Sequence, residues 1–73
     1  MATEEDRLAE AAAAYRRLYD ELAEARRELA ETIVDAARAR VPQKRIVTIS
    51  GYTREHVRRI CRTAGIEPED GDV

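Results

Sequence analysis

The chain has 73 residues, a formal net charge of -2 and 38% charged side chains, with one cysteine and one histidine. A single cysteine excludes an internal disulfide, and one histidine disfavours a zinc site of the usual His/Cys kind, so neither stabilises so short a chain. No apolar run approaches the length of a membrane span and no charged-then-apolar signal is present at the start, so we expect one cytoplasmic domain stabilised by oligomerisation.

Charge is strongly divided along the chain. Residues 1–37 carry ten acids and five Arg, residues 38–66 carry eight Lys or Arg and one acid, and residues 67–73 carry four acids. Such asymmetry indicates a charged partner, and nucleic acid is the usual partner of a basic segment. The alternative is a solvated charged surface.

Residues 3–40 are predicted to form one long helix. The segment contains no Pro or Gly and is rich in Ala, Glu, Arg and Leu, which are good helix formers. Thr3, followed by three acids, has the pattern of an N-cap. Pro42 sets the end of the helix, because a residue before proline avoids helical geometry.

Apolar side chains on this helix follow a heptad spacing. We predict that they form a dimer seam of the coiled-coil type, with these residues at the interface: Leu8, Tyr15, Leu18, Leu22, Leu29 and Ile33. The alternative is that the stripe packs only on the following helices of its own chain, which are too short to cover it. Opposed charges favour antiparallel pairing, about Leu22 or about a point closer to residue 33. Pairing about Leu22 brings Leu8 to Ala36 and Tyr15 to Leu29.

Two short helices are predicted next, at residues 42–49 and 53–64. Pro42 suits a first helical position, Gly51 suits a tight turn, Thr53 is a natural N-cap and Gly65 ends the last helix. We expect the acidic residues 67–73 to be a disordered tail.

The last helix is predicted to be amphipathic. Val57, Ile60, Cys61 and Ala64 share one face, and the opposite face carries Glu55, Arg58, Arg59 and Arg62. The apolar face is expected to complete a core with residues of the first two helices and the turn: Ile33, Val34, Ala37, Val41, Ile46, Val47, Ile49 and Tyr52. Ile66 is expected to close the bottom of that core.

A helix, a short turn containing Gly and a second helix form a helix-turn-helix arrangement, in which the second helix reads the DNA major groove. The base-reading residues predicted from this geometry are Arg54, Glu55, Arg58 and Arg59, since Arg pairs with guanine and Glu accepts from cytosine. For Glu55, the alternative is an acid favoured by the helix dipole. The phosphate-binding residues predicted are Gln43, Lys44, Arg45, Tyr52, Thr53, His56 and Arg62.

The segment "RIVTISGYTREHVRRI" resembles the tri-helical helix-turn-helix of lactose-repressor-type and resolvase-type DNA-binding domains. The resemblance covers residues 33–64 and rests on the Ile46-Val47 pair, Ile49, the Gly51-Tyr52-Thr53 turn, Val57 and Ile60. Val47 stands where many members carry Ala. The whole layout also resembles small actinobacterial helix-turn-helix proteins, some of them nucleoid-associated. That resemblance implies binding to the chromosome.

The predicted fold is therefore all-α, with a long dimerisation helix running into a tri-helical unit and no wing after Gly65. The expected function is that of a homodimeric, sequence-selective protein of the nucleoid or a transcription regulator, bound to double-stranded DNA at a short palindrome containing G·C pairs. Pairing about Leu22 would place the two DNA-binding units roughly 40 Å apart, near one DNA turn.

Other classes remain as alternatives. The heptad helix could recruit another DNA-bound protein, which would make the chain a protein-interaction module. RNA binding is weakened by the lack of exposed aromatic residues for stacking. We expect no enzyme activity, metal, cofactor, membrane contact or small-molecule ligand, because the sequence has no catalytic set, metal cluster or phosphate loop.

Overall fold

A computed structural model describes residues 3–66, which form three α-helices joined by short turns. α1 spans Glu4–Arg38, α2 spans Gln43–Ser50 and α3 spans Arg54–Thr63. The predicted all-α fold, with a long first helix followed by two short ones, is confirmed. The predicted acidic tail lies outside the described residues.

α1 begins at a capping box. The Thr3 hydroxyl accepts a hydrogen bond from the Asp6 backbone N–H at 3.1 Å, and the Asp6 carboxylate accepts one from the Thr3 N–H at 3.2 Å. Both contacts satisfy backbone donors that a helix start leaves without partners. The N-cap predicted at Thr3 is therefore confirmed, and the acids that follow it lie at the positive end of the helix dipole.

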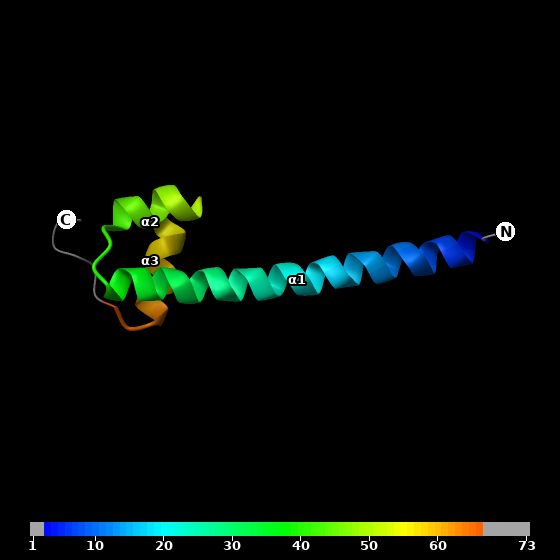
Figure 1. The fold of residues 1–73 in the computed structure, drawn as a ribbon, viewed down its shortest axis with the longest axis horizontal. Coiled ribbons are helices and arrows are strands. Elements are labelled where there is room, and N and C mark those ends of the chain that lie inside the picture. Colours follow the sequence, from blue (N-terminus) through cyan, green and yellow to red (C-terminus); the bar gives the residue numbers. More distant parts are fainter. Residues whose placement is uncertain (1–2, 67–73) are drawn as a thin grey trace.

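The molecule is elongated, with a longest extent of 63 Å. Figure 1 shows α2 and α3 gathered beside the C-terminal part of α1, while the remainder of α1 projects away from them. We call residues 29–66 the head and residues 4–28 the arm. A helix with this little tertiary support is unusual in water, because packing of an apolar face supplies most helical stability in proteins.

One residue from each helix forms the buried centre of the head. Ile33 of α1 is 3% exposed, Ile46 of α2 is 5% exposed and Val57 of α3 is 0% exposed. The side chains packed around them are Leu29, Ala36, Ala37, Val41, Val47, Tyr52, Ile60 and Cys61. Most of the predicted core is confirmed. Val47 is one of the packed side chains, at the position where many helix-turn-helix proteins with a similar motif carry Ala.

Ile49 lies outside the predicted core, because it is 70% exposed. Val34, Ala64 and Ile66, which were also predicted there, are half-buried but are not among the side chains packed around the buried centre. α2 is only eight residues long and buries Ile46, with Val47 and Ser50 half-buried beside it. Residues four apart share a side of a helix, so Ile49 lies on the side of Arg45, which is also exposed. The prediction that Ile49 packs in the core is therefore wrong.

α1 ends in a Schellman motif with an unusual residue at its turning point. The Arg40 N–H donates to the Ala37 carbonyl and the Val41 N–H to the Ala36 carbonyl, both at 3.0 Å. Arg40 has a φ of 67°, in the left-handed region where Gly is normally found. After this turn, Pro42 is the N-cap of α2. It therefore stands one position before the first helical position that the sequence predicted for it.

Replacing Arg40 with Gly should stabilise the protein. Gly adopts a positive φ without the steric cost borne by Arg, so we expect the free energy of unfolding to rise by about 0.5–1 kcal/mol. Thermal unfolding followed by circular dichroism would show this as a higher melting temperature. Arg40→Ala is the control, because it removes the charge and keeps the strained φ. An equal gain in both variants would assign the effect to charge.

Candidate nucleic-acid interface

The turn between α2 and α3 determines where α3 begins. Gly51 has a φ of 76° and its N–H donates to the Val47 carbonyl at 3.0 Å. Thr53 then caps α3, with its hydroxyl accepting from the His56 N–H at 3.1 Å. Both roles were predicted from the sequence and both are confirmed. Together they start a regular helix at Arg54, whose first two residues, Arg54 and Glu55, are exposed.

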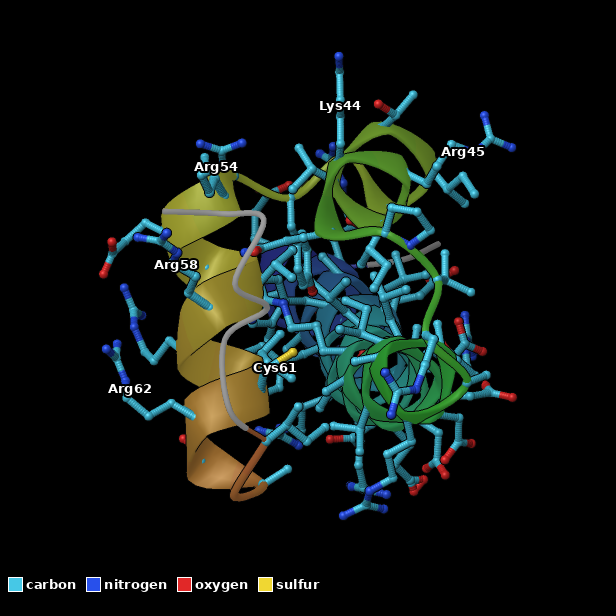
Figure 2. The ribbon with its side chains drawn as sticks, turned by 90° about the vertical axis from the view of Figure 1, so that its left-hand side faces the viewer. Lys44, Arg45, Arg54, Arg58, Cys61 and Arg62 are labelled. Carbon is cyan, nitrogen blue, oxygen red and sulfur yellow. The ribbon has the colours of Figure 1, made fainter. Side chains whose placement is uncertain are left out.

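α3 has an apolar inner face and a basic outer face. Val57, Ile60 and Cys61 pack against the core of the head. In Figure 2, which looks along α1, Arg54, Arg58 and Arg62 project from the side of α3 that faces away from the other helices. We call the exposed side of α3 the arginine face. It includes these residues: Arg54, Glu55, Arg58, Arg59 and Arg62.

Arg58 differs from the other members of the arginine face. Its side chain is half-buried, whereas Arg54, Glu55, Arg59 and Arg62 are exposed. Its Nε atom is enclosed and has no hydrogen-bond partner within residues 3–66. Partial burial restricts a long side chain, so less conformational entropy would remain for Arg58 to lose on binding a ligand.

Tyr52 and His56 form a stacked pair at the start of α3. Their ring centroids are 4.0 Å apart with an interplanar angle of 11°. The Tyr52 N–H also donates to the Ser50 hydroxyl at 3.1 Å. Both aromatic residues are half-buried, so they hold the turn against the core, and the phosphate contacts predicted for them remain predictions.

The basic residues of α2 lie on different sides of that helix. Lys44 is exposed and projects away from α1, whereas Arg45 points to the side of α2 opposite α3 (Figure 2). Gln43 is half-buried at the start of the helix. Of the three, Lys44 is the residue best placed to share a surface with the start of α3, and Arg45 is separated from the arginine face.

Ion pairs within residues 3–66 involve only α1. Arg7 contacts Glu4 at 3.2 Å and Arg27 contacts Glu24 at 3.5 Å, and all four side chains are exposed. The eight basic residues of positions 38–66 therefore have no ion-pair partner within the described part of the chain. The head thus presents a concentrated positive charge, whose effect on anionic ligands falls as salt rises.

Cys61 lies between α3 and α1, as Figure 2 shows. Burial raises the pKa of the Cys61 thiol, because desolvation penalises the thiolate. It is therefore a small, neutral packing residue at pH 7, as the sequence predicted. Over residues 3–66, no three His, Cys, Asp or Glu side chains come together as a metal site.

The residues predicted for the dimer seam fall into two groups. Leu8, Tyr15, Leu18 and Leu22 are between 49% and 70% exposed on the arm. Ile33 is instead buried in the head, and Leu29 packs against the same core. The prediction that Ile33 contacts a second copy is therefore wrong, because α2 and α3 of its own chain cover it.

The predicted pairing about Leu22 is corrected for the same reason. That register needs Ala36 and Leu29 to meet a second copy, and both pack against the core of the head. A dyad near residue 33 meets the same obstacle. Leu22, Leu29 and Ala36 share one heptad position, so their spacing alone does not show which of them the head covers.

None of the described helices combines the length and the hydropathy needed to cross a membrane. No family model, curated protein or solved structure matches the chain. The function is therefore inferred from the geometry and charge of the head and the arm.

Proposed function

We propose that the chain is a homodimeric protein that binds double-stranded DNA with some sequence selectivity. In this proposal α2, the Gly51 turn and α3 act as a helix-turn-helix, and α3 enters the major groove. The observation that carries it is the arginine face, which is basic, exposed except for the half-buried Arg58, and free of intramolecular ion pairs within residues 3–66. The biological role would be that of a transcription regulator or an architectural protein of the nucleoid.

The spacing of the arginine face supports insertion into a groove. Arg54, Arg58 and Arg62 recur at every fourth residue and cover about 12 Å of helix length. That length is close to the width of the major groove, about 12 Å. The three side chains can therefore contact the bases of one groove and the phosphates at its edges. Residues near the start of α3 would reach furthest, which leaves Arg62 for the phosphates.

Base reading is assigned to Arg54, Glu55, Arg58 and Arg59. An Arg guanidinium can donate two hydrogen bonds to O6 and N7 of guanine, and a carboxylate can accept from N4 of cytosine. Glu55 and Arg59 are both exposed and lie one turn apart on α3. Their combination supports a site with G·C pairs, because phosphates alone would repel Glu55.

Phosphate binding is assigned to residues at the edge of this surface. The Thr53 hydroxyl accepts from the His56 N–H and keeps its own proton to donate. Lys44 is exposed near the start of α2, where backbone N–H groups also favour an anion. Gln43, Tyr52 and His56 are half-buried, so their contribution would be smaller than that of Lys44 and Arg62.

A gel-shift titration against a mixed pool of duplexes tests the proposal directly. At low salt we expect the chain to retard the pool, and repeated selection from random sequence should enrich G·C-containing half-sites. Binding without enrichment of any sequence would favour an architectural role. The absence of a shift at low salt, at protein concentrations up to about 100 µM, would exclude DNA as the partner. Non-specific DNA binding has dissociation constants of about 1–100 µM even at physiological salt.

Lys44→Ala should weaken binding to all duplexes by a similar factor. Loss of one phosphate contact reduces the number of counterions released, so the slope of log affinity against log salt should decrease in magnitude by about 1. Fluorescence anisotropy at several salt concentrations would measure it. Arg45→Ala is the matched control, because Arg45 points away from α3. An equal change in slope for both variants would contradict the assigned orientation of DNA.

The exposed apolar residues of the arm support a second candidate function, a module that recruits another protein. Leu8, Tyr15, Leu18 and Leu22 form a stripe that a helix of a different chain could also cover. Sedimentation of the purified chain separates the two functions. A monomer at all concentrations that nevertheless binds DNA would favour recruitment of a different partner.

A further inference from the structure

The arm carries an apolar stripe that the chain itself leaves uncovered. Its members follow the heptad spacing, and we call them the seam: Leu8, Ala11, Tyr15, Leu18, Leu22 and Ala25. All six are exposed, and the ring of Tyr15 lies 6.1 Å from the ring of Tyr19, which is outside the seam. A run of large exposed apolar side chains on one face of a helix marks an interaction surface.

The head limits how a second helix can lie on this seam. Heptad spacing places Leu22 and Leu29 on the same face of α1, and Leu29 already packs against the core of the head. The seam and the docking site of α2 and α3 are thus consecutive parts of one stripe. A helix laid along the seam must therefore end where the head begins, near Leu29.

This limit excludes a parallel pair of identical chains. In a parallel pair, equal residues face each other, so the two heads would lie at the same level on the facing sides of the two α1 helices. Each head would then occupy the volume of the other. The head of each chain lies at one end of α1 (Figure 1). An antiparallel pair therefore places the two heads at opposite ends.

One antiparallel register fits the length of the free face. When Leu22 faces Ala11 of the second copy, Leu8 faces Ala25 and Tyr15 faces Leu18. Large side chains then lie opposite small ones toward both ends of the seam. A shift of one heptad either way leaves Leu8 or Leu22 without an apolar partner. In the matching register, Glu4 of the second copy reaches the level of Leu29, where the head begins.

Charged residues beside the seam complement each other in the same register. Glu5 lies beside Arg26 of the second copy on one flank, and Arg7 lies beside Glu28 on the other. The two-fold symmetry repeats both contacts. All four side chains are exposed, and the existing Arg7–Glu4 contact is a solvated pair that costs little to rearrange. Such flanking charges determine the orientation of paired helices.

We propose that the seam binds a second copy of this chain, antiparallel, with the two-fold axis between Arg16 and Arg17. This inference rests on the homodimer part of the proposed function and is independent of DNA binding. The occupant is a second copy because the free face, the length of the arm and the flanking charges are self-complementary in one register. It replaces both registers expected from the sequence alone.

Analytical ultracentrifugation provides the first test. The chain has a mass of 8.3 kDa, and we expect a species of about twice that mass. Leu22→Asp should give a monomer, because it places a charge in the seam opposite Ala11 of the second copy. Ala13→Asp is the matched control, since Ala13 is exposed outside the heptad positions of the seam, and it should remain a dimer. A monomeric parent chain, or a dimer that survives Leu22→Asp, would overturn the proposal.

Disulfide formation provides the test of register. In a Cys61→Ala background, Leu8→Cys and Ala25→Cys chains are oxidised with glutathione disulfide, separately and as a mixture. We expect the mixture to give a covalent dimer of one chain of each kind, and neither variant alone to cross-link. Self-cross-linking of Leu8→Cys would indicate a parallel pair and overturn the proposal, as would no cross-link in the mixture. A dimer with this register that fails to bind DNA would refute the proposed function alone.

Discussion

Arg59→Ala should reduce affinity for a selected DNA site about 5- to 150-fold, corresponding to about 1–3 kcal/mol for one bidentate contact to a base. Arg59 is exposed on the arginine face, within the first two turns of α3, and has no ion pair within residues 3–66. The loss should be larger for the selected site than for random duplex, because the contact reads a base edge. Anisotropy titrations with both duplexes at one salt concentration would measure the difference.

Arg59→Lys is the informative companion variant. Lys retains the charge and the attraction to phosphates, but a compact ammonium does not reproduce the planar fork of Arg. We therefore expect non-specific affinity close to that of the parent chain and reduced discrimination against altered sites. If Arg59→Lys discriminates as well as the parent chain, Arg59 contacts phosphate and the assigned depth of α3 in the groove is wrong.

Ile33→Ala should destabilise the head by about 2–5 kcal/mol. Ile33 is 3% exposed and meets Ile46 and Val57 at the centre of a three-residue core, so truncation leaves a cavity with few other contacts to offset it. In a domain this small such a loss approaches the whole stability. Thermal or urea unfolding followed by circular dichroism would show a lower midpoint, and DNA binding should weaken because α3 loses its support.

Ile49→Ala is the matched control for this variant. It removes the same atoms from a side chain that is 70% exposed, so we expect a change within about 0.5 kcal/mol. The comparison also separates the two roles considered for Ile33. If Ile33→Ala changed the dimer dissociation constant and left the unfolding midpoint of the head unchanged, Ile33 would be an interface residue after all.

Local chemistry explains why much of the fold could be predicted from the sequence. The Thr3 capping box, the Gly51 turn and the Thr53 cap each depend on residues within four positions of one another. The amphipathic pattern of α3 is equally local, and the exposed and packed sides follow it apart from the partial burial of Arg58. These features are decided before tertiary packing acts, so residue type and spacing suffice.

Features that depend on packing between helices were harder to predict. Ile49 is apolar and lies in a helix, yet the three-helix core is already closed by Ile46, Val47 and Val57. Ile33 and Leu29 fit a heptad seam by spacing, and only the position of α2 and α3 shows that the head covers them. The positive φ of Arg40 was missed because Arg, unlike Gly, gives no indication of a left-handed turn.

In the proposed dimer, the continuous α1 helix would also determine how far apart the two halves of a DNA target lie. With the two-fold axis between Arg16 and Arg17, the Ile33 positions of the two chains lie about 50 Å apart along the helix direction. That exceeds the 34–36 Å between half-sites one helical turn apart. If this dimer binds DNA as proposed, we expect two half-sites separated by a spacer instead of the short palindrome expected from the sequence. The length of α1 would set the length of that spacer, and α3 would contact the bases on either side.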